Sequence, residues 1–173
     1  ISTRKSLELI KKAKSKGLNV TCSVAIHNLV FNDEKLKDFD TRFKVLPPLR
    51  EEKDRLALIK GVRTGAIDMV TSDHLPIDIE NKKTDIKNAK YGTIGLESLF
   101  GSLLTLFKLD ETIEILTRGR KIFNIEKPRL EIDNKASLTL FTLEDYVFSK
   151  NHILSKSKNS AFLGIKMKGK PLG

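Results

Sequence analysis

The chain has 173 residues and a formal net charge of +10; 39% of its residues are hydrophobic and 31% are charged. This balance is typical of a globular protein with a substantial core, and no apolar stretch approaches the roughly 20 residues that a membrane helix needs. The single cysteine, Cys22, excludes an internal disulfide framework and predicts a reducing, cytoplasmic setting.

The positive charge comes mostly from lysines that are spread along the whole chain. Nucleic-acid sites usually combine clustered basic residues with aromatic side chains on which bases stack. The lysine clusters at 11–16 and 166–170 contain no aromatic residue. We therefore interpret the charge as a solvated surface, and we expect neither a nucleic acid nor a membrane as a partner.

Helix and strand patterns alternate from the first residues onward. Apolar residues at helical spacing predict a helix over 4–16, which Gly17 should end, and the β-branched alternation of 18–24 predicts a strand. The same pair follows again as a helix over 51–64 and a strand over 67–71. This alternation favours a parallel α/β sheet.

Long connections follow both predicted strands. The first, 25–48, should contain a short helix near 33–36 and is broken by Pro47-Pro48. The second, 72–94, is rich in Asp, Asn and Lys and precedes predicted helices over 95–108 and 110–123. A loop of this length in a compact domain is usually functional, and α/β barrels place their chemistry after the C-terminal ends of strands.

The character of the chain changes after about residue 124. Pro and Gly residues separate short segments, and residues 136–141 alternate as a strand would. We expect this tail to form a small β element with loops.

Asp73 is the residue with the strongest chemical potential, because it stands at the end of a predicted strand and opens a long loop. A carboxylate there could bind a metal or transfer a proton, and it could equally cap the next turn. His27, alone in a loop, is expected to be a hydrogen-bonded structural group, and His74 could be structural or a ligand. Cys22 is expected to be a small buried hydrophobe.

Several sequence blocks, in order and over almost the whole chain, resemble dihydroorotases, a family of cyclic amidohydrolases. The blocks are Ile1-Ser2-Thr3, Gly17-Leu18-Asn19-Val20-Thr21-Cys22, Lys44-Val45-Leu46-Pro47-Pro48-Leu49-Arg50, Thr71-Ser72-Asp73-His74-Leu75-Pro76, Tyr91-Gly92-Thr93-Ile94-Gly95-Leu96-Glu97 and Asn159-Ser160-Ala161-Phe162-Leu163-Gly164.

The resemblance implies the reversible cyclisation of N-carbamoyl-L-aspartate to dihydroorotate in pyrimidine biosynthesis, with one or two zinc ions. It implies that Asp73 is both a metal ligand and the proton-transferring catalytic group, and that most other ligands lie outside this chain. The fold implied is the C-terminal portion of a TIM-like (β/α)8 metal-dependent hydrolase barrel over residues 1–123. Residues 124–173 would complete a small β domain, and we expect the chain to belong to a longer protein.

The resemblance also places four residues at the substrate: Leu46, Ile77, Tyr91 and Gly92. Leu46 and Ile77 replace an Asn and a His of the family pattern, whereas Tyr91-Gly92 would contact substrate through the backbone. A lost hydrogen bond to a charged group costs roughly 1.5–3 kcal/mol. Two such losses would weaken substrate binding by a factor on the order of 10² to 10⁴.

Two alternatives to an active dihydroorotase follow from those replacements. One is an inactive dihydroorotase-like subunit that acts as a scaffold for aspartate carbamoyltransferase. The other is a different cyclic amidohydrolase, such as a hydantoinase or an allantoinase. The partners implied are a small-molecule substrate, the remainder of the protein's own barrel and a second copy in a homodimer.

Overall fold

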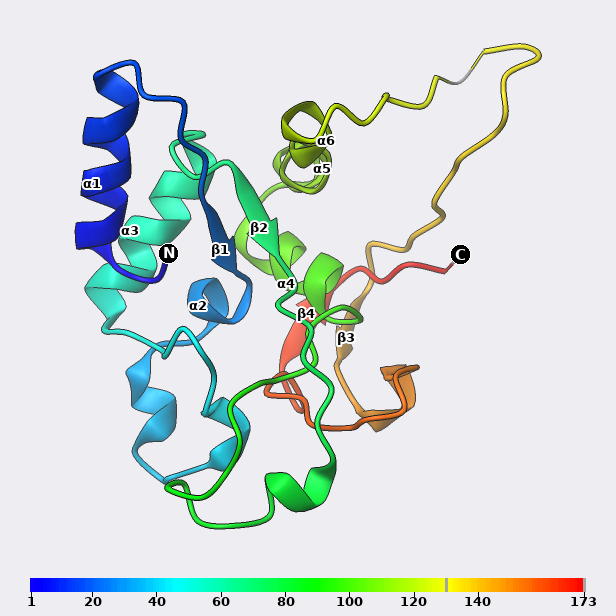
Figure 1. Cartoon of the computed structure of the whole chain (residues 1–173). Helices are drawn as coiled ribbons and strands as arrows, with labels where there is room; N and C mark the ends of the chain where they lie inside the picture. The colour runs from blue at the N-terminus through cyan, green and yellow to red at the C-terminus, as the bar shows by residue number, and fades with distance from the viewer. Residues whose placement is uncertain (130, 173) are drawn as a thin grey trace.

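The computed structural model describes residues 1–129 and 131–172 and shows two small sheets with helices packed around them (Figure 1). In chain order the helices and strands of the first part are α1 (Arg4–Ser15), β1 (Ser23–Ala25), α2 (His27–Val30), α3 (Glu52–Arg63) and β2 (Met69–Thr71). The second part contains α4 (Leu99–Leu106), α5 (Leu109–Thr117), α6 (Gly119–Ile122), β3 (Asp145–Val147) and β4 (Lys166–Lys168). Short 3-10 turns occupy Asp33–Leu36, Thr41–Phe43, Ile79–Asn81 and Lys150–His152.

The first two long helices form where local signals predict them. Thr3 caps α1 by accepting a hydrogen bond from the Ser6 N–H at 3.0 Å, and Gly17 follows its end with a φ of +75°. α3 carries acidic residues in its first turn and basic residues in its last, which suits the helix dipole. The two helices pack together on one side of the β1–β2 pair (Figure 1).

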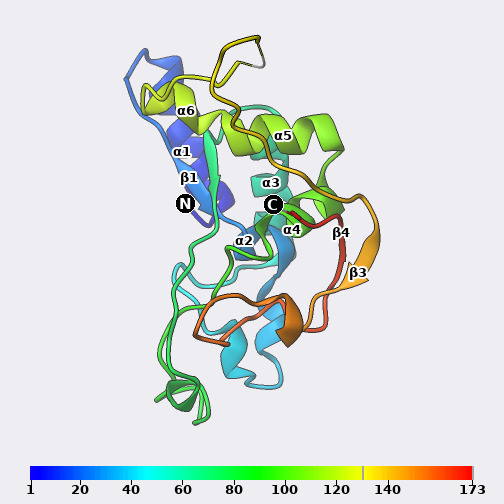
Figure 2. The ribbon, with the colours of Figure 1, turned by 90° about the vertical axis from the view of Figure 1, so that its right-hand side faces the viewer.

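β1 and β2 pair in parallel, with Val24 opposite Val70, which confirms the predicted parallel arrangement. The predicted strand over 18–24 is wrong at its start, because pairing with β2 begins only at Ser23. Both strands point toward the end of the molecule where their connections gather, as the turned view also shows (Figure 2). The described residues give this sheet two strands, so the closed barrel stays a prediction.

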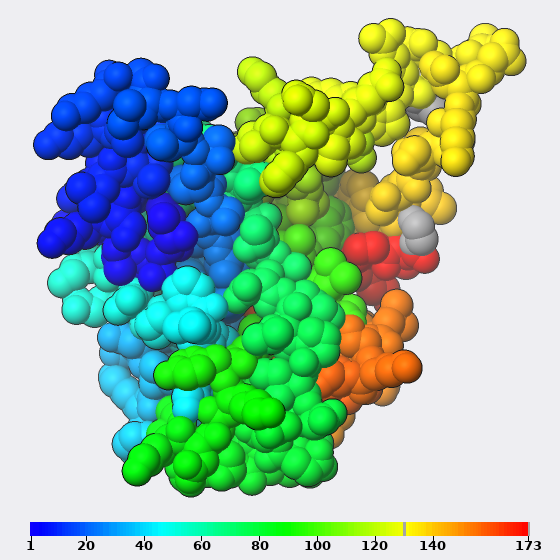
Figure 3. All heavy atoms as spheres, viewed as in Figure 1, coloured from blue at the N-terminus to red at the C-terminus, as the bar shows by residue number. Residues whose placement is uncertain are grey.

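The tail forms its own antiparallel pair, in which Tyr146 lies opposite Met167, and β4 packs against α4. The strand predicted over 136–141 is wrong: its only described pairing is a single bridge from Phe141 to Pro171. The described residues from 123 to 140 are exposed and project from the body (Figure 3). Exposed chain without a partner strand does not form a ladder, whatever its alternation.

The main core lies between the first sheet, its helices and the tail. Its fully buried side chains include Val24, Leu58, Ile94, Leu103 and Phe162. The tail thereby shares one core with the residues that follow β1 and β2. None of the helices in the described parts of the chain is long and apolar enough to cross a membrane.

Candidate functional site

Asp73 lies two residues beyond the end of β2, at the end of the sheet where both long connections begin. Its backbone adopts a φ of +46°, a left-handed conformation that Asp tolerates better than most residues. Its side chain is 42% exposed. The carboxylate is therefore presented at the C-terminal end of a parallel strand, the position that the sequence predicts for it.

His27 lies beneath Asp73. It is the first residue of α2 and fully buried, and its Nδ1 is 3.8 Å from Oδ2 of Asp73. Burial lowers the pKa of His27, while the Asp73 charge and the Pro47 carbonyl raise it, so the neutral form is favoured overall. Neither ring nitrogen makes a hydrogen bond of good geometry to a described residue, although the Pro47 carbonyl is close enough to raise the pKa of the ring. The expected place of His27 in a loop is wrong, because β1 leads directly into α2, which begins at His27 and buries this side chain.

His74 is tied to the tail by a network of hydrogen bonds. Its Nδ1 accepts from the Leu96 N–H at 3.2 Å, and its Nε2 is 3.3 Å from Oγ of Ser155. Because Nδ1 accepts, the ring proton is on Nε2, and the Ser155 hydroxyl therefore accepts from His74 and donates to Glu97. A serine that donates to a carboxylate in this way is not an activated nucleophile, and His74 is a structural group.

Glu97 completes the same network. Burial raises the pKa of its carboxyl, but hydrogen bonds from the Ser155 hydroxyl and backbone N–H outweigh burial, and the pKa is lowered overall. The ionised carboxylate thus links the segment before α4 to the tail.

Ile77 and Gly92, two of the predicted substrate residues, are brought together. The Ile77 N–H donates to Oδ1 of Asn159 and to Oγ of Ser157, both at 3.0 Å. Gly92 is buried with a φ of +127°, and a Cβ added there would lie 2.9 Å from Cδ1 of Ile77. Only glycine fits this backbone conformation and this approach.

Lys44 connects Tyr91, a third predicted substrate residue, to this group. Its carbonyl accepts from the Gly92 N–H at 3.0 Å, and its Nζ lies 4.6 Å from the ring centroid of Tyr91. Lys82 reinforces the connection by donating to the carbonyls of Thr41 and Lys44, each at 3.0 Å. Leu46, two residues further on, is 61% exposed and stands outside the core.

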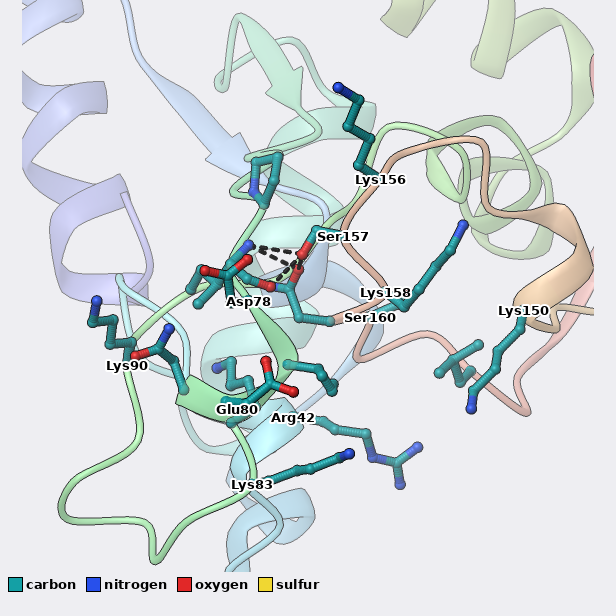
Figure 4. A pocket seen from close by; sticks show the side chains of 17 residues that line it. Arg42, Asp78, Glu80, Lys83, Lys90, Lys150, Lys156, Ser157, Lys158 and Ser160 are labelled. Atoms are coloured by element: carbon teal, nitrogen blue, oxygen red, sulfur yellow. Dashed lines mark hydrogen bonds between the residues drawn. The ribbon is translucent and has the colours of Figure 1, made fainter.

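A cavity of about 900 Å³ opens between the loop that follows Asp73 and the tail (Figure 4). Lysines from both segments border it, among them Lys83, Lys150 and Lys156. Ile77 lines it, but Asp73, Leu46, Tyr91 and Gly92 do not. The cavity therefore adjoins the predicted site and does not coincide with it.

Within the described part of the chain, no group of three or more His, Cys, Asp or Glu side chains could hold a metal ion. Asp73 is a suitable oxygen ligand by its chemistry, exposure and position, but the described residues around it do not complete a metal site.

Sequence patterns did not reveal the roles of Ser155 and Asn159. The side-chain Nδ2 of Asn159 donates to the Leu75 carbonyl at 3.0 Å, and the backbone carbonyl of Asn159 accepts from the Ile94 N–H at 3.1 Å. The only available signal was the place of Asn159 in a family block. Nothing in the sequence around Ser155 distinguishes it from the neighbouring serines.

The chain resembles dihydroorotases over nearly its whole length, as its sequence blocks predict. It is 38% identical to the dihydroorotase of Bacillus subtilis over 180 residues, covering 99% of this chain and 42% of that protein. It is 36% identical to the dihydroorotase of a Wolbachia endosymbiont of Drosophila simulans over 176 residues, covering 98% of this chain and 40% of that protein. The chain thus spans about two fifths of the length of these curated relatives. No protein-family model matches the chain.

Solved structures of cyclic amidohydrolases have the same arrangement. An L-hydantoinase from Arthrobacter aurescens matches with a TM-score of 0.85 and 25% identity, covering 99% of this chain and 41% of that one. The dihydroorotase of Saccharomyces cerevisiae matches in fold with a TM-score of 0.78 and 14% identity, covering 99% of this chain and 49% of that one. The predicted resemblance to dihydroorotases is therefore confirmed.

Proposed function

We propose that the protein containing this chain is a dihydroorotase that interconverts N-carbamoyl-L-aspartate and dihydroorotate in pyrimidine biosynthesis. The observation that carries the proposal is Asp73, a carboxylate at the C-terminal end of a parallel strand in a chain 38% identical to a dihydroorotase. The family pattern in the sequence and the position of Asp73 at the end of β2 in the fold indicate the same residue.

We propose zinc as the cofactor, with Asp73 as the ligand that this chain provides. Zinc accepts carboxylate oxygen readily, and when bound it supplies a Lewis acid and lowers the pKa of water. During ring opening the Asp73 carboxylate would take a proton from the water that attacks the ring carbonyl, and it would deliver that proton to the ring nitrogen as the ring C–N bond breaks. Its exposure leaves it accessible to substrate, as proton transfer requires.

Leu46, Ile77, Tyr91 and Gly92 are proposed to line the substrate position. The hydrogen bond from Gly92 to Lys44 and the close approach of Gly92 to Ile77 support a shared wall. Leu46 and Ile77 offer the substrate apolar surface, so the carboxylate of the substrate would be bound by groups outside this pair. An association as a homodimer or with aspartate carbamoyltransferase, and a cytoplasmic location, stay predictions.

The domain organisation is proposed as well. Residues 1–123 would supply the later βα units of the amidohydrolase barrel, which the parallel β1–β2 pair and its helices support. Residues 124–173 would complete a small β domain, supported by the separate antiparallel pair β3–β4.

Dihydroorotate hydrolysis by the intact protein tests the proposal, first with zinc supplied and then with a chelator added. We expect zinc-dependent turnover that falls on the order of 10²- to 10⁴-fold in Asp73→Ala, the range for losing a proton-transferring group. Asp78→Ala, at an exposed aspartate in the same loop, is the matched control and should retain activity. A folded, zinc-loaded protein that turns over a hydantoin but not dihydroorotate would refute the proposed substrate, and one that turns over neither would indicate an inactive subunit.

A further inference from the structure

His27 is a buried polar side chain without a well-formed hydrogen bond to a described residue. It is fully buried, and neither ring nitrogen makes a hydrogen bond of good geometry to the residues that the structure describes, the Pro47 carbonyl being a backbone acceptor close enough to raise its pKa. Buried donors and acceptors are nearly always satisfied in native proteins, so an unpaired one calls for an explanation. Its Nδ1 faces Asp73, at 3.8 Å from Oδ2.

The two groups differ in their freedom to move. The imidazole is enclosed by the core, and its neighbour Asn28 is held by a hydrogen bond to the Pro48 carbonyl at 3.2 Å. The Asp73 side chain is 42% exposed, and no hydrogen bond from a described residue holds its carboxylate. A carboxylate movement of less than about 1 Å would bring the pair within hydrogen-bond distance.

We propose that His27 is a positioning residue for Asp73. His27 donates its Nδ1–H to one oxygen of the Asp73 carboxylate, so that the other oxygen is directed to a metal ion. This inference rests on the proposed function. An imidazole has an N–H in either charge state, and the adjacent negative charge favours the tautomer with the proton on Nδ1. Carboxylates that bind metals are commonly oriented by a hydrogen bond of this kind.

Zinc affinity of the intact protein, measured by competition with a chelator, tests the inference independently of turnover. His27→Leu removes the donor but keeps an apolar side chain of similar bulk, and we expect zinc to bind about 10- to 100-fold more weakly. His27→Asn places an amide N–H near the position of Nδ1 and should bind zinc within about threefold of the unmodified protein. The metal-free His27→Leu protein should melt no lower than the unmodified protein, because no buried polar group is left unpaired.

Three results separate the possible outcomes. Zinc binding by His27→Leu at the unmodified affinity, or binding by His27→Asn as weak as that of His27→Leu, overturns the positioning role. If His27→Leu does not fold, His27→Gln, whose amide matches Nε2, supplies the same contrast with His27→Asn. Asp73→Asn in the same assay distinguishes the two proposals. If zinc binds more weakly to Asp73→Asn but with unchanged affinity to His27→Leu, only the positioning role is refuted. If the zinc affinity of both variants is unchanged, Asp73 is refuted as a ligand.

Discussion

Gly95 packs directly against the backbone that leads into Asp73, which makes it a sensitive point for a small substitution. A Cβ added there would overlap the carbonyl oxygen of Ser72, the residue before Asp73. A carbonyl cannot rotate away as a side chain can, so Gly95→Ala must shift one segment by on the order of 1 Å, and such overpacking typically costs about 1–3 kcal/mol. Misplacing a catalytic group by about 1 Å can also cost on the order of 10²-fold in rate.

The assay compares urea unfolding and dihydroorotate turnover of the intact protein with and without Gly95→Ala. Gly119→Ala is the matched control, because its added Cβ would meet only the flexible Met69 side chain, with Sδ at 3.0 Å. We expect Gly95→Ala to lose both stability and kcat/KM, and Gly119→Ala to keep both. If Gly95→Ala leaves stability and turnover unchanged, the contact with Ser72 does not position Asp73 and the reasoning is refuted.

Two ionisable groups predict that the free energy of unfolding rises with pH, one in the acidic range and the other in the alkaline range. Burial raises the pKa of Asp68, but hydrogen bonds from Lys14 Nζ and the Cys22 N–H, both at 2.7 Å, outweigh it and lower the pKa below 3.8. The stabilisation by ionised Asp68 is present at neutral pH and is lost as pH falls through the lowered pKa. Asp68→Asn should lower the free energy of unfolding by about 1–3 kcal/mol at pH 7. Urea unfolding at several pH values should also show a weaker dependence on acid in this variant. Burial, with the Lys44 charge, lowers the pKa of Lys82 from 10.5 to about 8, so the unfolded state binds more protons between these values. The free energy of unfolding should therefore rise across that range by at most ~1.4 kcal/mol per pH unit, and Lys82→Met should remove this rise.

The helices were predictable because their signals are local. The expected helices over 4–16 and 51–64 agree with Arg4–Ser15 and Glu52–Arg63 to within a residue at each end. The helix predicted over 95–108 begins only at Leu99, since Leu96 to Ser98 form a turn after the contact of Gly95 with Ser72. The strand over 18–24 was too long and that over 136–141 was wrong, because a strand depends on a partner that alternation alone does not reveal.

The candidate site was predictable in one part and not in the other. Asp73 could be found because a strand end followed by a long loop is visible in the sequence, and the family pattern marks the same residue. The buried place of His27 could not, because it depends on α2 starting directly after β1 and on parallel pairing that sets β1 beside β2. Ser155 was missed for the same reason, since its partners His74 and Glu97 are distant in sequence.

These contacts show how two parts of the chain hold the segment around Asp73 from opposite sides. On the sheet side, Gly95 packs against the backbone of Ser72, and His27 faces the Asp73 carboxylate. On the tail side, Ser155 holds His74, and Asn159 holds both Leu75 and Ile77. Residues 74 to 77 thus gain most of their fixed contacts from the tail, whereas the carboxylate of Asp73 itself stays free of hydrogen bonds to the described residues. A held backbone beside an exposed carboxylate suits a group that must bind an ion and also transfer a proton, because its position is preorganised while its oxygens stay accessible.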